Sequence, residues 1–276
     1  FVYLWLYLNL KMTQHPLAAM LAGHNTEIHQ LANTLKTGID AEVIHALRVE
    51  TKRMRAILRL LRFFQPHWPY GRHYDAFRTL FHAAGALREL QLQLGMLKAA
   101  PDKDLAFYEI YRVHLMGQMV EARRHLQDIL KKKLPAGDDL VEAADMQFKY
   151  CRKSDFALYF NAKAEEIHRY KTGNPYLDPA NIHPLRKAIK DYNNNRRNTK
   201  TALKFDPGPV PDFSHADSDM EKMLGDWNDF DTALIHLAQA EKQKWARPHH
   251  DAILELRRYW TDCADALWYA LDEQPR

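Results

Sequence analysis

The sequence is poor in cysteine, with Cys151 and Cys263 as the only two in 276 residues. They lie far apart and match no metal-binding or redox spacing, so we expect reduced, mostly buried thiols in a cytoplasmic protein. The 15 histidines form no HExxH motif or paired HxxxH motif beside acids, which argues against a zinc site. We therefore expect neither a metal ion nor a cofactor.

The sequence also lacks a long hydrophobic run. The most apolar stretch is residues 1–11, FVYLWLYLNLK, and it is too short to span a bilayer. It has no charged n-region and no small-residue cleavage site, which argues against a signal peptide. We expect an extension of residues 1–11 ahead of Met12, and no membrane association.

Strand-like alternation is absent, and glycine and proline are concentrated at a few junctions. The sequence therefore predicts an all-α fold, with Asp40 and Asn181 as helix N-caps. Helices are predicted over 15–36, 40–64, 72–99, 102–133, 138–171 with a restart at Ser154, 181–205, 214–243 and 248–272. A boundary at 134–138 divides them into an N-terminal half, 12–134, and a C-terminal half, 138–276. Each half has about four helices, which suggests one four-helix bundle per half.

One face of the predicted helix over 40–64 is purely cationic. At helical periodicity this face carries His45, Arg48, Lys52, Arg55, Arg59 and Arg62. The opposite face carries Leu47, Met54, Ile57, Leu58 and Leu61. Exposed helix faces usually mix both signs of charge, because neighbouring like charges weaken the helix. A stripe of one sign therefore favours an anionic ligand.

A second stripe of the same kind follows in the helix over 181–205. It carries His183, Arg186, Lys190, Arg197, Lys200 and Lys204, interrupted by Asn193. The motif His-x-x-Arg-x-x-x-Lys begins at His45 in the first stripe and at His183 in the second, a spacing of half the chain. Internal duplication explains this spacing. The formal net charge is only +4, so the stripes are local concentrations of charge.

The helix after each stripe also repeats. GALRELQLQL begins at Gly85 and GDWNDFDTAL begins at Gly225, which is nearly the same spacing as that from His45 to His183. Glu89 thus corresponds to Asp229, and Gln91 to Asp231. Acids here can accept hydrogen bonds from the neighbouring cations and fix their direction. The alternative is general acid–base chemistry by paired carboxylates, which we consider the weaker interpretation because the first copy has lost one acid.

These two motifs together resemble the CHAD domain, the conserved histidine α-helical domain. The resemblance covers about residues 17–270. It is carried by His45, Arg48, Lys52, Arg53, Arg55, Ala56 and Leu58–Leu60, by His183, Arg186 and Lys190, and by LGDWNDFDTAL at residues 224–234. It implies two pseudo-symmetric four-helix bundles around a central basic groove or pore.

The resemblance also implies a function, because the CHAD family is known for binding inorganic polyphosphate and its members can localise to polyphosphate granules. We therefore expect non-catalytic polyphosphate binding in the cytoplasm, with granules as a target. The family motif assigns this role to His45, Arg48, Lys52, Arg55, Arg59, His183, Arg186 and Lys190. The geometry of the stripes adds Arg62, Arg197, Lys200 and Lys204. Asn193 departs from the family pattern, so we expect the C-terminal half to bind more weakly or to use Arg197 in its place.

Other interpretations remain open. Each stripe is also compatible with a solvated face that has no ligand. The run Lys131–Lys133 is compatible with cations that simply stabilise a helix C-terminus. A basic groove suits RNA or DNA, but single strands favour aromatics among the cations, and the stripes contain none. A polyphosphate-processing enzyme would use Asp226, Asp229 and Asp231, with Mg²⁺, although no P-loop is present. The sequence gives no oligomeric state.

Overall fold

The computed structural model describes residues 14–68, 70–101, 105–172, 179–208 and 217–272. The predicted extension at residues 1–11 lies outside these ranges. Within them the regular secondary structure is helical throughout, which confirms the predicted all-α class. The elements are α2 Pro16–Thr37, α3 Ala41–Phe64, α4 Tyr70–Ala99, α5 Leu105–Lys131, α6 Asp138–Phe148, α7 Lys153–Thr172, α8 Pro179–Leu203, α9 Asp217–Glu241, the 3₁₀ helix η1 Lys244–His249, and α10 His250–Asp272.

The start of α3 follows from its capping residue. The Asp40 carboxylate accepts hydrogen bonds from the backbone N–H groups of Glu42 and Val43, at 2.9 and 3.0 Å. The first turn of a helix leaves such N–H groups without intrahelical partners, and a carboxylate also suits the positive end of the helix dipole. The predicted cap at Asp40 is therefore confirmed, and it fixes where the cationic face of α3 begins.

The start of α8 differs from the prediction. The sequence places the cap at Asn181, but the helix begins at Pro179, so Asn181 lies inside it. Proline is well suited to the first helical position, because its φ angle is preset and no partner exists there for an N–H group. At the other end Lys204 takes a left-handed φ of 53°. The Phe205 N–H then donates to the Thr199 carbonyl at 3.2 Å, which closes the helix.

The predicted helical region 138–171 consists of two helices. α6 ends at Phe148 and α7 begins at Lys153, one residue before the predicted restart at Ser154. The Asp155 carboxylate accepts a hydrogen bond from the Arg152 N–H at 2.7 Å, at the entry to α7. These two helices belong to the rim of the molecule.

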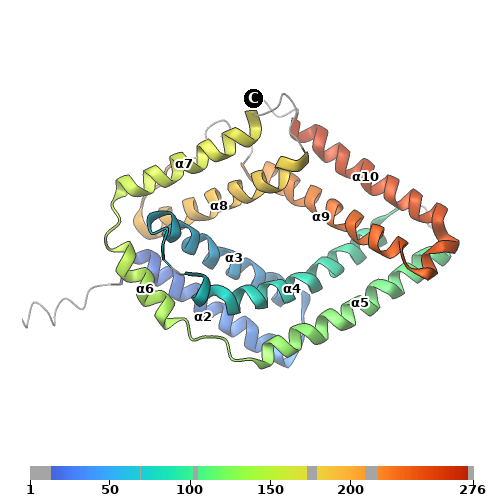
Figure 1. Ribbon diagram of the computed structural model, residues 1–276, viewed down its shortest axis with the longest axis horizontal. Helices are drawn as coiled ribbons and strands as arrows, with labels where there is room; N and C mark the ends of the chain where they lie inside the picture. Colours follow the sequence, from blue (N-terminus) through green and yellow to red (C-terminus); the bar gives the residue numbers. More distant parts are fainter. Residues whose placement is uncertain (1–13, 69, 102–104, 173–178, 209–216, 273–276) are drawn as a thin grey trace, which may run out of the picture.

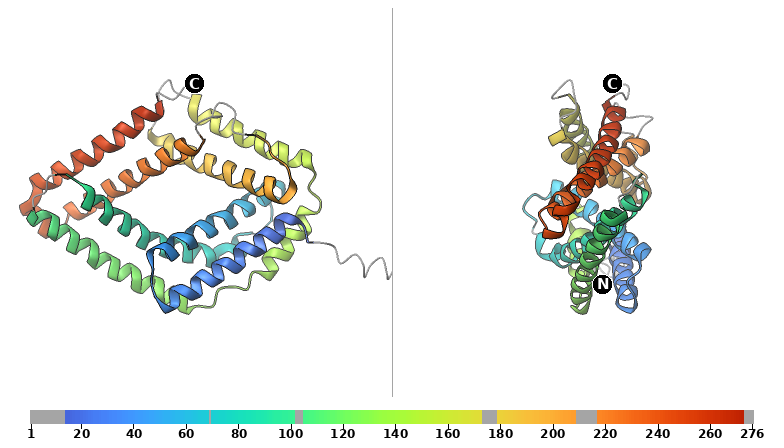
Figure 2. Two further views of the ribbon diagram at one scale, coloured as in Figure 1. Left: turned by 180° about the vertical axis from the view of Figure 1, so that it is seen from behind. Right: turned by 90° about the vertical axis from the view of Figure 1, so that its right-hand side faces the viewer.

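The helices form a flattened, diamond-shaped arrangement with an inner and an outer set (Figure 1). The inner set is α3, α4, α8 and α9, and the rim consists of α2, α5, α6, α7 and α10. The side view in Figure 2 shows that the molecule is thin in the perpendicular direction. α3 contacts α8, and α4 contacts α9. The two helices that carry the cationic stripes therefore lie against each other.

Two hydrophobic cores hold this arrangement together. The larger core combines side chains such as Leu58 of α3 and Ile189 of α8. The smaller core combines Leu97 of α4, Leu237 of α9 and Trp260 of α10. Burial of a large apolar side chain stabilises the fold by about 1.5–3 kcal/mol. Because each core draws helices from both halves of the chain, the structure does not confirm a separate bundle for each half.

The predicted boundary at 134–138 falls between α5 and α6, but packing crosses it. Both cysteines, Cys151 and Cys263, are free and half-buried. Across the described ranges no helix has the combination of length and apolar character that crossing a membrane requires.

Candidate functional site

α3 presents cations because its two faces differ in burial. The predicted core face is confirmed by five buried residues, Leu47, Met54, Ile57, Leu58 and Leu61. The opposite face carries four half-buried cations, Arg48, Lys52, Arg55 and Arg59, and two exposed side chains, His45 and Arg62. Half-buried cations lose hydration, so this face depends on its partners more than an ordinary solvated surface does.

Arg48 is held by several residues of α4. Its Nη1 donates to the Phe81 backbone carbonyl at 3.2 Å, and its Cζ lies 4.6 Å from the centroid of the Phe81 ring. Glu89 places Oε1 4.0 Å from Nη2. A Cβ atom on Gly85 would collide with the guanidinium group, so the lack of a side chain there makes room for it. The Arg48 side chain is only 15% exposed, and this burial lowers its pKa, partly offset by Glu89.

Arg55 shares the same aromatic ring. Its Cζ lies 5.1 Å from the Phe81 centroid, so two guanidinium groups contact one ring. A cation over an aromatic face gains about 0.5–2 kcal/mol, with the larger values in desolvated settings. The ring can therefore keep Arg48 and Arg55 close together in spite of their like charge.

α8 supplies the second set of cations. Its apolar face is buried at Leu185, Ile189 and Tyr192. On the other face Arg186 is half-buried and Nη1 donates to Asn228 Oδ1 at 3.5 Å, the long limit of a hydrogen bond. The Nε atom of Arg186 is buried without a hydrogen-bond partner in the described part of the chain.

Acids of α9 lie close to this second set. Burial lowers the pKa of Arg186, and the charges of Asp229 and Glu221 oppose that shift. Burial also lowers the pKa of Lys190, whose Nζ lies 4.0 Å from Glu221 Oε1. The α8 cations are therefore partly neutralised, whereas Arg48 and Arg55 of α3 lie against a carbonyl and an aromatic ring.

Lys52 is the point where the two stripes meet. Burial lowers its pKa to about 7, and four cations add to this shift: Lys190, Arg48, Arg186 and Arg55. Two of these come from α3 and two from α8, which contact each other. The described residues provide its amine with no hydrogen bond and no ion pair. We call these five residues the cation cluster: Arg48, Lys52, Arg55, Arg186 and Lys190.

The remaining predicted cations lie outside this cluster. Arg59 of α3 donates from Nη1 to both carboxylate oxygens of Asp191 on α8, at 2.7 and 2.5 Å. The Arg197 side chain is 67% exposed and lies 3.8 Å from Glu221. Lys200 pairs with Asp206 at 2.8 Å, and Lys204 is exposed just past the end of α8. Most of these side chains therefore have an acid or a structural partner.

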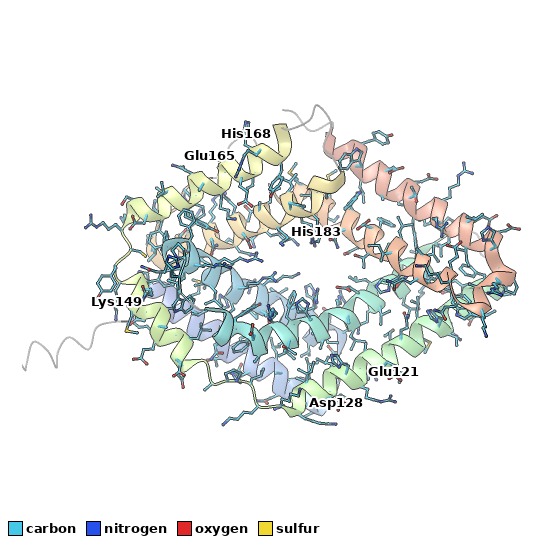
Figure 3. The ribbon with its side chains drawn as sticks, viewed as in Figure 1. Glu121, Asp128, Lys149, Glu165, His168 and His183 are labelled. Atoms are coloured by element: carbon cyan, nitrogen blue, oxygen red, sulfur yellow. The ribbon has the colours of Figure 1, made fainter. Side chains whose placement is uncertain are left out.

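The two motif histidines are exposed and lie near the start of their helices. Figure 3 places His183 on α8, beside the centre of the molecule, whereas Glu121 and Asp128 lie on the outer rim along α5. This position is compatible with a contact to a ligand of the cation cluster.

The acids of the repeated motif lie beside the arginines, as the sequence predicts. Glu89 lies near Arg48, and Asn228, next to Asp229, contacts Arg186. Burial raises the pKa of Asp229, while the positive charges of Arg186 and Lys190 act in the opposite direction. Within the described ranges, no group of three or more His, Cys, Asp or Glu side chains is placed to hold a metal ion. The geometry therefore favours buttressing over the Asp226, Asp229 and Asp231 magnesium site.

Sequence reasoning missed Glu221, which lies near Lys190, and also Phe81. Phe81 is a buried aromatic on a helix, so from sequence it looks like an ordinary core residue. It lies four residues before Gly85, one helical turn along α4, and this spacing places the two residues on one face. That spacing was the available clue that Phe81 faces the same guanidinium group as Gly85.

The run Lys131–Lys133 lies on another part of the surface. Lys131 pairs with Asp128 at 2.7 Å. Lys132 and Lys133 line a surface hollow together with Lys36 and other residues of α2. Both interpretations of this run, a helix terminus and a binding element, remain open.

These features define an all-α protein whose inner helices bring cations of two stripes together. The CHAD domain family model matches residues 19–238, so the chain belongs to the CHAD domain family. A search of curated proteins found no matching sequence. Among solved structures, the chain is similar to the crystal structure of the CHAD domain from the plant Ricinus communis, with 18% sequence identity and a TM-score of 0.68. The match covers 95% of this chain and 93% of that one, and at this identity it shows the fold.

Proposed function

We propose that this chain binds inorganic polyphosphate at the cation cluster and does not process it chemically. The observation that carries the proposal is the meeting of four cations from α3 and α8 around the unpaired amine of a fifth, Lys52. Like charges held this closely repel one another, and a polyanion between them removes the repulsion. The CHAD family is known for binding polyphosphate, which supports this choice of anion.

The chemistry of the cluster suits a chain of condensed phosphates. Such a chain carries about one negative charge per phosphate and has no bases to be read. Cations one turn apart on a helix are separated by roughly 5 Å along its axis, within reach of successive phosphates through long side chains. Arginine offers forked donors to phosphate oxygens, and lysine a mobile point charge. The buried Nε of Arg186 is one donor that such an oxygen would satisfy.

Nucleic acid fits this cluster less well. Single strands are held largely by bases that stack on exposed aromatic side chains. The aromatic ring at the cluster, Phe81, is buried and already lies against Arg48 and Arg55. It therefore offers no free face for a base. We accordingly infer a cytoplasmic polyphosphate-binding protein that accumulates where polyphosphate does, such as in granules.

Calorimetric titration with long-chain polyphosphate tests this proposal. We expect saturable binding that weakens at least tenfold when salt rises from about 50 to about 200 mM, because neutralised phosphates release their counterions. Arg48→Ala combined with Arg186→Ala should abolish binding and leave helicity unchanged. The matched control is Arg123→Ala combined with Arg124→Ala, which removes the same charge from exposed positions of α5.

Two further measurements separate the alternatives. Single-stranded RNA added as a competitor should displace little polyphosphate. Incubation with polyphosphate and Mg²⁺ should release no phosphate. Sustained turnover that Asp229→Ala abolishes would instead establish an enzyme, and full binding by the Arg48 and Arg186 double variant at low salt would place the site elsewhere.

A further inference from the structure

The environment of Lys52 is unusual for a lysine. The residue lies in the middle of α3, is half-buried, and has no acid or hydrogen-bond acceptor paired with its amine among the described residues. Lysine amines are strongly hydrated point charges, so a charged amine in this position has lost water without gaining a partner. An amine in such a place changes its protonation state readily.

All the charges that act most strongly on Lys52 are positive. α3 contributes Arg48 and Arg55, and α8 contributes Arg186 and Lys190. The nearby acids face other cations: Glu89 of α4 lies beside Arg48, and Glu221 and Asp229 of α9 lie beside Arg186 and Lys190. The neighbouring helices therefore supply no negative charge directed at the amine itself.

Burial and these four cations lower the pKa of Lys52 to about 7. A lysine in water has a pKa of about 10.4. Around neutral pH the free protein is therefore a mixture of molecules with a charged and an uncharged Lys52. At about pH 8 only about one molecule in ten carries the charge.

Building on the proposed function, we propose that Lys52 takes up a proton when a polyphosphate chain binds, so that above neutral pH the site is fully charged in the complex but mostly lacks this charge in the free protein. The amine then points at phosphate oxygens where before it had only cations around it. A site of this kind responds to the local density of negative charge, because closely spaced phosphates are needed to offset five cations at once.

The direction of the pH dependence follows from linkage. A ligand that prefers the protonated amine raises the pKa of Lys52 in the complex, and by reciprocity protonation raises the affinity for the ligand. Binding is therefore strongest below pH 7, where the amine is already charged. As pH rises above 7 the proton must be taken from solution, and the affinity falls towards tenfold per pH unit until the pKa of the complex is reached.

The exposed histidines His45 and His183 lie on the same stripes and must be separated from this effect. The measurement is therefore made from about pH 7.5 to about pH 9, above the range in which histidine usually titrates. Long polyphosphate chains are used, because only their terminal phosphates titrate near neutral pH. Arginines and carboxylates keep their charge in this range. Lys190, the other amine of the cluster, also has a pKa that burial lowers, so Lys190→Arg is measured beside the wild-type protein and should keep the proton uptake.

Calorimetry of the full chain with long-chain polyphosphate, in buffers of different ionisation enthalpy, measures the proton uptake directly. We expect about 0.9 proton per site at about pH 8, and an affinity that falls between five- and tenfold per pH unit. Lys52→Arg carries a charge that does not titrate, so its uptake should be near zero and its affinity nearly independent of pH. Lys52→Met should also lose the uptake, but with weaker binding throughout.

The outcomes separate this inference from the proposed function. Tight binding by the wild-type protein without proton uptake at about pH 8 overturns the role of Lys52 and leaves polyphosphate binding intact. Uptake that persists in Lys52→Arg or Lys52→Met assigns the proton to another group and also overturns it. Absence of binding at every pH is a different result, because it removes the proposed function itself. The proton uptake of the wild-type protein tests the inference by itself, so this test does not depend on whether any variant folds.

Discussion

Arg48 and Arg186 occupy matching places in the two cationic stripes, but the protein holds them differently. Arg48 has a backbone carbonyl, an aromatic face and a glycine that makes room for it, all from α4. Arg186 has one long hydrogen bond to Asn228, a buried Nε without a partner, and the acid Asp229 nearby. Arg48 is therefore held mainly by neutral groups, with Glu89 4.0 Å away, whereas Arg186 is balanced mainly by negative charge.

The difference extends to the residue one turn before the repeated glycine. Phe81 of α4 precedes Gly85 by the same interval as Glu221 of α9 precedes Gly225, so the two residues correspond. Phe81 contacts Arg48 and Arg55, whereas Glu221 lies near Lys190 and Arg197. One copy thus supports its cations with a ring and the other neutralises them with a carboxylate. The N-terminal half should accordingly contribute more to the binding of an anion, in line with the weaker C-terminal half that the sequence predicts.

The largest expected effect comes from comparing the two arginines singly. Arg48→Ala should weaken polyphosphate binding about 100-fold, because a preorganised charged donor contributes roughly 1.5–3 kcal/mol. Arg186→Ala should weaken binding only about tenfold, because Asp229 already offsets part of the charge that this substitution removes. Titration calorimetry at one low salt concentration measures both. A larger loss of affinity in Arg186→Ala than in Arg48→Ala would show that the C-terminal half dominates binding and would contradict this comparison.

The two repeated glycines offer a matched pair with a smaller effect. Gly85→Ala places a Cβ against the Arg48 guanidinium, whereas Gly225 has open space where its Cβ would lie. The atoms that the new Cβ would meet belong to the far end of the flexible Arg48 side chain, so the Gly85→Ala variant should still fold. It should weaken binding about tenfold, because the guanidinium group of Arg48 is displaced. Gly225→Ala should leave the affinity unchanged and stabilise α9 by up to about 1 kcal/mol.

Affinity and thermal unfolding should be measured together for this pair. Unchanged affinity in Gly85→Ala would mean that the position of Arg48 does not matter for binding. A lowered melting temperature in both variants would point instead to helix packing.

The smallest effects are expected from the acids. Asp229→Asn removes a negative charge beside Arg186 and Lys190, so binding should strengthen about three- to tenfold at neutral pH. Glu89→Gln should strengthen it less, about twofold, because Glu89 is more exposed to solvent and lies 4.0 Å from Arg48. Calorimetry on both variants tests this. Weaker binding in Asp229→Asn would show that orientation of Arg186 by the carboxylate outweighs the charge it removes.

The sequence alone was sufficient to predict the helices and to identify much of the cation cluster. Periodicity alone places Arg48 and Lys52 opposite Leu58, because burial on α3 follows the 3.6-residue repeat. The family resemblance implied a central basic groove or pore, but no local pattern shows that α3 and α8 pack against each other. The spacing from Gly85 places Phe81 only on a shared face of α4, and its contact with the guanidinium groups depends on where Arg48 points.

Local sequence patterns also could not predict ion pairs between residues that lie far apart in the sequence. Asp191 lies 132 residues from Arg59, and nothing near either residue identifies its partner. The same limit applies to the two cores, each of which gathers helices from both halves. Helical periodicity shows which face is apolar, but the choice of covering helix depends on the complete topology.

The bridge between Arg59 and Asp191 shows how far the two copies have diverged. With the two stripes aligned at their motif histidines, Arg59 corresponds to Arg197 and Asp191 corresponds to Arg53. The symmetry-related version of this bridge would therefore pair two arginines, which repel each other. Two copies of the N-terminal half would place Arg53 opposite Arg59 and could not form the contact, whereas two copies of the C-terminal half would pair Arg197 with Asp191. Exchanging the C-terminal half for a second copy of the N-terminal half would therefore leave the half-buried Arg59 without its counterion.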